Sequence, residues 1–185
     1  MTILSKYDDI SGWSVRQSGT LDIYNDGADS TENSLKVSDR QMSGAGLKVD
    51  LNTTCLVEGK RYEFKAQTKL IDADGQPFAC IASKGYNDPL ACPLLGFEFI
   101  NNGTSDVKHY SNDNPAEYEA DGWNHYRAVF TITHQLATAE SAFLMVQGPA
   151  PGVEIAIDRV TLKVHQPPQA NCGQLVVNNN AEVSS

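Results

Sequence analysis

The chain has 185 residues, a formal net charge of −9 and a sequence pI near 4.8. This acidity argues against a nucleic-acid or anionic-membrane surface, because both need clustered Lys and Arg side chains. Hydrophobic residues make up 41% and charged residues 20%, which excludes a disordered chain. No apolar run approaches the roughly 18 residues of a membrane helix, so no membrane insertion is expected.

Short segments bounded by Gly, Asn, Asp or Pro predict β-strands along most of the chain. In residues 61–71, Tyr62, Phe64 and Leu70 share one parity and charged residues the other, as in a half-buried strand. No stretch carries a helical period, so we predict an all-β, two-sheet antiparallel β-sandwich. The predicted strands, in chain order, are 20–24, 33–39, 46–51, 61–71, 78–83, 94–100, 124–133, 141–148 and 153–164.

Two of these strands depart from simple alternation. Residues 141–148 (SAFLMVQG) are apolar on both parities, which predicts a central strand covered on both faces. In residues 153–164 the apolar parity changes from odd to even at Asp158 and Arg159. That change predicts a β-bulge or a sheet-switching bend.

The cysteines show neither the spacing of a zinc site nor a redox motif. Four cysteines allow three disulfide connectivities, and the sequence does not choose among them. Cys80 with Cys92 would close a short loop, whereas Cys55 with Cys172 would tie the sandwich to the tail.

Two N-glycosylation sequons, at Asn52 and Asn102, accompany the cysteines. Together they favour an oxidising, extracellular setting; free buried thiols and chance sequons are the alternative. Residues 1–10 lack the features of a signal peptide, so the protein is either cytosolic or a piece of a longer precursor. We favour the extracellular precursor.

Ordered sequence pieces carry a resemblance to a known group. The pieces are GW at 12–13, NSLKVSDR at 33–40, GLKVDL at 46–51, VEGKRYEFKAQTKL at 57–70, DGWNHYRAVFTI at 121–132 and IDRVTL at 157–162. In this order they resemble the carbohydrate-binding modules of families four, nine and twenty-two, over residues 3–164. The resemblance implies a calcium-bearing β-sandwich of jelly-roll type that holds polysaccharide. Such modules are attached to glycoside hydrolases or repeated in extracellular proteins.

The resemblance implies three polar ligand-binding residues, Arg16, Arg40 and Gln147. Where the xylan binders have a Trp-Gly pair after the second Arg, this chain has residues 42–44 (MSG), which puts xylan in doubt. Gln67, on the polar parity of its strand, is a further candidate for the same face, with plain solvent exposure as the alternative.

A glycan site also needs flat aromatic platforms among polar groups. Tyr86, Tyr110 and Tyr118 lie in polar, loop-like surroundings and are the platform candidates, although each could instead cover the edge of the sandwich. Phe97 and Phe99 alternate with a Glu and are expected to belong to the core.

The resemblance also implies a structural Ca²⁺. Asp9 matches the acidic residue of the opening stretch in these modules, and Asp158 matches the Asp of their last strand. Backbone carbonyls near residues 29–33 would complete the six to eight oxygens that calcium prefers.

The C-terminal residues of the chain resemble its N-terminal residues. With one ungapped offset, Val176, Val177 and Glu182 fall on Ile3, Leu4 and Asp9. We therefore expect residues 1–166 to form the module and residues 167–185 to be a linker and the first strand of a following repeat.

These observations predict a noncatalytic carbohydrate-binding module whose partners are a polysaccharide and neighbouring modules of the same polypeptide. A structural or adhesive extracellular repeat that has lost sugar binding is the alternative. An enzyme is less favoured, because the sequence has no G-x-S-x-G and its four histidines lack metal-ligand spacing.

Overall fold

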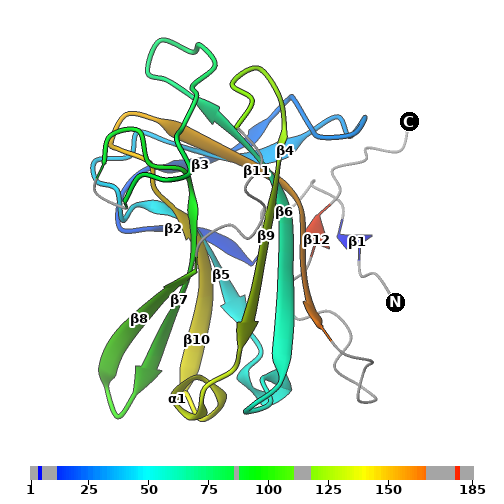
Figure 1. Ribbon diagram of the computed structural model, residues 1–185, viewed down its shortest axis with the longest axis vertical. Helices are drawn as coiled ribbons and strands as arrows, with labels where there is room; N and C mark the ends of the chain where they lie inside the picture. The colour runs from blue at the N-terminus through cyan, green and yellow to red at the C-terminus, as the bar shows by residue number, and fades with distance from the viewer. Residues whose placement is uncertain (1–3, 6–11, 86–87, 111–117, 166–177, 180–185) are drawn as a thin grey trace.

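The structure, a computed structural model, describes residues 4–5, 12–85, 88–110, 118–165 and 178–179. Ten strands form two five-stranded antiparallel sheets that face each other (Figure 1). Two further short strands, β1 (Leu4–Ser5) and β12 (Asn178–Asn179), pair with each other in parallel. The predicted all-β, two-sheet sandwich of jelly-roll type is confirmed.

Each sheet is named here after its central strand. The β10 sheet has the order β2 (Trp13–Arg16), β5 (Gly46–Leu51), β10 (Ser141–Gln147), β7 (Leu94–Asn101) and β8 (Thr104–Tyr110). The β11 sheet has the order β3 (Thr20–Tyr24), β4 (Ser34–Ser38), β11 (Glu154–Val164), β6 (Arg61–Ile71) and β9 (Asn124–Thr131).

The core lies between the two sheets and follows the period-two alternation of the strands. Leu144 and Val146 of β10 and Ile155 and Ile157 of β11 are at most 1% exposed. The predicted core positions Phe97 and Phe99 on β7 are confirmed, because they are 0% and 2% exposed.

Both irregular strands behave as predicted. Strand β10 is the third of five strands, and its outward-facing Met145 is as fully buried as its inward-facing Leu144. Strand β11 has a β-bulge, since Asp158 pairs with Gln67 and the next paired residue is Thr161, with Lys65. Three steps along β11 therefore match two along β6, which changes the buried parity.

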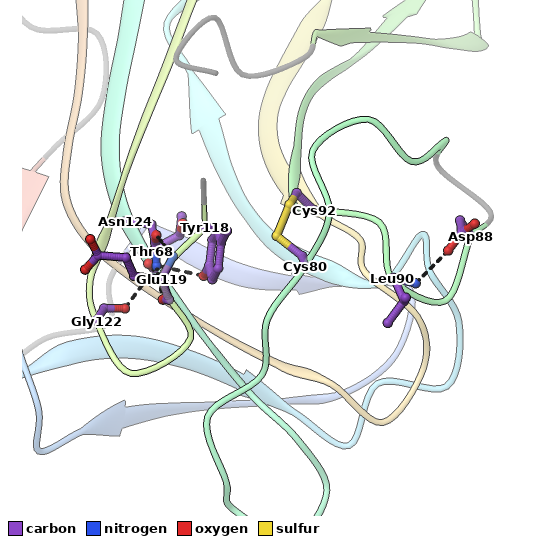
Figure 2. Close-up of a disulfide and its surroundings, with 9 residues drawn as sticks. All are labelled: Thr68, Cys80, Asp88, Leu90, Cys92, Tyr118, Glu119, Gly122 and Asn124. Carbon is purple, nitrogen blue, oxygen red and sulfur yellow. Dashed lines mark hydrogen bonds between the residues drawn. A yellow bond between two sulfur atoms is a disulfide. The ribbon is translucent and has the colours of Figure 1, made fainter. Parts of the chain in front are cut away.

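The predicted strand at 78–83 is wrong. This stretch has only one isolated bridge, Ile81 with Ala91, and its Cys80 forms a disulfide with Cys92 (Figure 2). The cross-link and the bridge hold it as a loop. The pairing is one that the sequence left open; Cys55 is also disulfide-bonded, and Cys172 lies outside the described residues.

Apart from the short strands β1, β2 and β12, three further elements are missing from the predicted set. Strand β8 is polar on both parities and gives no alternation signal. The other two are the short helix α1 (His134–Ala137), which Thr133 caps by accepting from the Leu136 N–H, and the 3₁₀ turn η1 (Thr53–Cys55). In the described part of the chain no helix is long and apolar enough to cross a membrane.

The close approach of β5 and β10 depends on a glycine. A Cβ built at Gly46 would lie 2.0 Å from the carbonyl oxygen of Val146, which belongs to the backbone and cannot turn aside. We expect Gly46→Ala to lower the free energy of unfolding by about 2–3 kcal/mol in urea denaturation. Gly85→Ala is the matched control, because a Cβ there meets nothing within 4 Å. Equal stability of the two variants would contradict the packing described here.

Candidate functional site

The outer face of the β10 sheet carries polar contacts that cross from strand to strand. Arg16 of β2 pairs with Gly46 of β5, and Gly46 pairs with Gln147 of β10. Because Gly46 has no side chain, Arg16 can reach across it. Its Nη1 donates to Oε1 of Gln147 at 3.3 Å and to the carbonyl oxygen of Gly44 at 2.8 Å.

Arg16 also forms an ion pair that is largely withdrawn from solvent. Its Nε donates to Oε2 of Glu98 on β7 at 3.0 Å, with side-chain exposures of 13% and 24%. The other oxygen of Glu98 accepts from Oγ of Ser105 on β8 at 3.2 Å. Both charged groups are therefore held in place by partners on neighbouring strands.

Gln147 connects this ion pair to an imidazole. The Gln147 side chain is 1% exposed, and its Nε2 donates to Nε2 of His109 on β8. An amide nitrogen can only donate, so this contact requires Nε2 of His109 to accept and places the proton of the neutral ring on Nδ1. Burial, and then the positive charge of Arg16, lower the pKa of His109 below its ordinary value of 6.5. We call Arg16, Glu98, His109 and Gln147 the outer-face cluster.

Apolar groups lie beside the outer-face cluster. Met145 packs over Gly96, where an added Cβ would lie 2.5 Å from the Met145 methyl carbon. Among the described residues of these five strands, Phe143 is the one aromatic side chain that alternation places on the outer face, and the Lys48 ammonium lies 3.9 Å from its ring centroid. The face thus offers mainly hydrogen-bonding groups and one covered ring.

The structure brings together two of the sequence-predicted ligand residues, Arg16 and Gln147. Sequence reasoning missed Glu98 and His109. Glu98 could have been found, because it alternates with the core residues Phe97 and Phe99 and so must face outward. His109 gave no usable signal, since its strand shows no alternation.

Arg40 occupies a different place from the one expected of a ligand-binding residue. It is 2% exposed and lies beyond the end of β4. Its guanidinium donates to five backbone carbonyl oxygens, those of Ser43, Ala45, Pro149, Ala150 and Val153. Arg40 therefore ties two loops together and has no donor turned toward an outside ligand.

Two of the predicted tyrosine platforms, Tyr110 and Tyr118, are partly buried and pack against the core. The Tyr110 ring packs on Phe97 and Phe130 in the core, at centroid distances of 5.7 and 5.0 Å. Burial raises the pKa of Tyr110 and, strongly, that of Tyr118, whose hydroxyl donates to the Thr68 carbonyl oxygen (Figure 2). Tyr86 lies outside the described residues.

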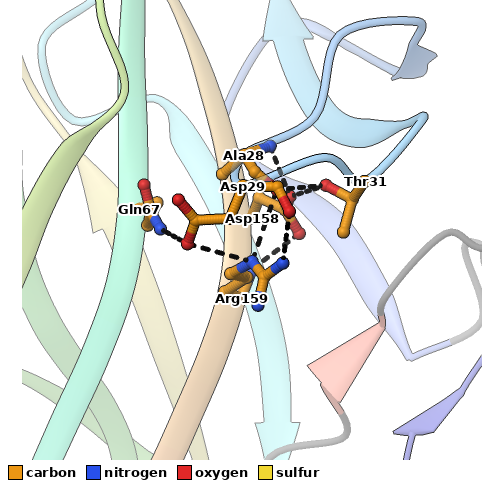
Figure 3. Close-up of polar contacts among 6 residues, drawn as sticks. All are labelled: Ala28, Asp29, Thr31, Gln67, Asp158 and Arg159. Atoms are coloured by element: carbon orange, nitrogen blue, oxygen red, sulfur yellow. Dashed lines mark hydrogen bonds and ion pairs between the residues drawn. The ribbon is translucent and has the colours of Figure 1, made fainter.

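Gln67 does not join the outer-face cluster, because it lies on the other sheet. Its Nε2 donates to a carboxylate oxygen of Asp29 at 2.5 Å, and the side chain is 5% exposed. Gln67 therefore helps to hold the loop of residues 25–33 on the outer face of the β11 sheet (Figure 3).

Asp158, one of the residues expected to bind calcium, lies at this same loop, but its carboxylate oxygens accept from N–H and O–H groups. Oδ2 of Asp158 accepts from the Ala28 N–H at 2.8 Å and from the Thr31 hydroxyl at 2.5 Å, while Oδ1 accepts from the Arg159 N–H at 2.6 Å. The described residues contain no cluster of three or more acidic, His or Cys groups suited to a metal, and Asp9 lies outside them. This donor set does not fit a calcium shell.

The fold is similar to that of known carbohydrate-binding modules. No known family model matches the sequence, and none of the curated proteins matches it. The CBM22-2 xylan-binding domain of Xyn10C from Paenibacillus barcinonensis superposes with a TM-score of 0.63 at 12% identity, over 84% of this chain and 93% of that one. The CBM22-1–CBM22-2 tandem domain of the same Xyn10C gives 0.61 at 15% identity, over 88% and 43%.

The same fold also occurs inside a different kind of protein. The enzymatically active domain of tailspike protein 4 from bacteriophage CBA120 gives a TM-score of 0.53 at 16% identity, over 88% of this chain and 20% of that one. At these identities the similarity establishes the β-sandwich alone, and function has to be argued from the site.

Arg40 should be required for stability rather than for binding. We expect Arg40→Met to lower the free energy of unfolding by about 3 kcal/mol or more, because it leaves buried carbonyl oxygens without donors. Arg61→Met is the matched control, since Arg61 is exposed. A urea denaturation curve of Arg40→Met that matches wild type would contradict the assignment.

The electrostatic effect of Arg16 on His109 can be tested by titration. We expect the NMR-measured pKa of His109 to lie below 6.5 and to rise part of the way back in Arg16→Gln, since burial remains when the charge is removed. Because the unfolded chain binds this proton more readily, His109 should make the fold less stable as pH falls from about 6.5 to its lower folded pKa. Arg127→Gln, on the β11 sheet, should leave the titration unchanged.

Proposed function

We propose that the protein is a noncatalytic carbohydrate-binding module that holds a polysaccharide chain on the outer face of the β10 sheet. The outer-face cluster carries this proposal. Sugar hydroxyls both donate and accept, and the cluster combines the partly exposed guanidinium of Arg16 and carboxylate of Glu98 with the His109 imidazole, while the buried Gln147 amide holds Arg16 and His109 in place.

The fixed geometry of the cluster supports binding. Gln147 is almost completely buried, yet both ends of its amide are held, by Arg16 and by His109. Glu98 is held from two sides in the same way, by Arg16 and Ser105. A ligand that meets such groups loses little additional conformational entropy, because they are already in place.

The same geometry favours binding over catalysis. Both carboxylate oxygens of Glu98 already accept hydrogen bonds from the protein, one from the Arg16 guanidinium and one from the Ser105 hydroxyl. Glycoside hydrolysis needs a second carboxylate as partner. Asp50, the other acidic residue that alternation places on this face, is separated from Glu98 by Phe143 in the strand register.

The setting of the module is part of the proposal. The Cys80–Cys92 disulfide is typical of a protein in an oxidising, extracellular compartment. A tandem arrangement agrees with the similarity between the tail and the opening residues and with the tandem domain from Xyn10C, which shares this fold.

A specific observation also favours a second candidate, a structural or adhesive repeat without sugar binding. Tyr110 and Tyr118 face the core, and Lys48 covers Phe143, so no open aromatic platform is found among the described residues of the β10 sheet. Polysaccharide modules commonly use such rings for stacking on sugar faces. The two candidates differ in whether any glycan is retained.

A binding screen separates these candidates. The folded protein would be tested against β-glucans, xylans, mannans, chitin, alginate and sulfated galactans. We expect retention on one class and an affinity lower by about tenfold or more in both variants, because Arg16→Met removes a hydrogen-bonding group and Gln147→Ala removes the buried amide that holds Arg16 and His109 in place.

Arg127→Met is the matched control, since Arg127 forms a comparable ion pair with Glu63, at 2.7 Å, on the other sheet. Circular dichroism would verify that every variant is folded. Wild-type affinity in both cluster variants would remove the site assignment. No retention of any polysaccharide by the folded wild type would favour the adhesive repeat.

A further inference from the structure

The loop of residues 25–33 is held on the β11 sheet by a guanidinium at the position where the sequence led us to expect a metal ion. Nη2 of Arg159 donates to the Asp29 carbonyl oxygen at 2.9 Å, and its Nε donates to the Ala28 carbonyl oxygen at 3.3 Å (Figure 3). The same Nε lies 3.4 Å from a carboxylate oxygen of Asp29. One cationic side chain thus contacts three oxygens of one loop.

The β-bulge brings Arg159 to this loop. In a regular strand Arg159 would face away from the side to which Asp158 points. The extra residue at the bulge and the positive φ of 50° at Arg159 direct both side chains to the loop. A left-handed φ is uncommon for a residue with a side chain, and it is retained at sites where neighbouring contacts fix it.

The two adjacent charges hold opposite ends of one backbone segment. Asp158, 0% exposed, accepts from the Ala28 N–H, whereas Arg159 donates to the Ala28 carbonyl oxygen. A second cation acts on the same loop, because Nζ of Lys69 donates to a carboxylate oxygen of Asp26 at 2.6 Å. Gln67 donates to Asp29 in the same region. The carboxylates of Asp26 and Asp29 and the carbonyl oxygens of Ala28 and Asp29 therefore have cationic or N–H partners from the protein itself.

We propose that the Arg159 guanidinium serves as a built-in cation that replaces a structural calcium ion and makes this fold independent of divalent metal. Calcium needs six to eight oxygens around one centre. Here the oxygens that converge are shared among N–H and O–H donors, and an ion placed among them would be repelled by the positive charge of Arg159. A planar guanidinium instead offers several donors in a fixed fork, which suits carbonyl and carboxylate oxygens.

Thermal unfolding of the full chain tests the proposal directly. For the wild type we expect the same Tm in excess EDTA and in millimolar CaCl₂, and no heat of calcium binding by isothermal titration. A saturable rise in Tm with CaCl₂, or measurable calcium binding, would overturn the proposal, because a ligand that binds the native state must stabilise it.

Substitution tests the role of the guanidinium. Arg159→Gln should lower the Tm by about 5 °C, because it leaves loop carbonyl oxygens without their charged donor. Arg159→Lys should recover only part of that loss, since an ammonium lacks the fork. The matched control is Arg127→Gln, which removes an ion pair from the same sheet and should change the Tm less. An equal change in Arg159→Gln and Arg127→Gln would overturn the proposal.

A charge reversal provides an independent readout. Arg159→Asp removes the repelling cation and adds a carboxylate beside Asp158, so its Tm should be low in EDTA and should rise on addition of CaCl₂ but not of MgCl₂. Circular dichroism would first verify that this variant is folded. If CaCl₂ then leaves its Tm unchanged, the proposal that the guanidinium occupies the position of a cation would be contradicted. If the variant does not fold, the wild-type titration and the Arg159→Gln comparison still decide.

Discussion

The apolar layer between the two sheets is the constraint on which the other features depend. Leu144 and Val146 face Ile155 and Ile157 across this layer, and all four are essentially inaccessible to solvent. Burial of apolar surface in such a layer is the main source of stability in a sandwich. Because side chains alternate along a strand, fixing the inner face also fixes which residues face outward. The outer-face cluster and the loop on the β11 sheet both follow from that choice.

The sequence predicted the sandwich well because apolar and polar residues alternate wherever one face of a strand is buried in this inner layer. It located most strands, the central position of β10 and the bulge in β11. It failed at residues 78–83, where a disulfide and a bridge hold an apolar stretch as a loop, and at β8, an edge strand with no apolar face of its own. Alternation reports burial on one side, and it cannot detect a strand that is polar on both.

The candidate site was less predictable, because a side chain's direction depends on more than its strand. Arg40 follows Asp39, whose φ of 53° turns the chain, so strand parity does not extend to it. Tyr110 ends a strand that the sequence did not reveal, and its ring faces the core. Arg16 and Gln147 came from an ordered resemblance, and their contact across Gly46 depends on sheet pairing that no local pattern encodes.

The uncharged amide of Gln147 determines the net charge of the outer face of the β10 sheet. Alternation places two cations, Arg16 and Lys48, and two anions, Asp50 and Glu98, on the described strands of the β10 sheet. A carboxylate in place of this amide would leave the surface negative, whereas the amide leaves it balanced. Because these formal charges sum to zero, the face would exert little long-range attraction on an anionic or a cationic chain, and recognition would depend on short-range hydrogen bonds.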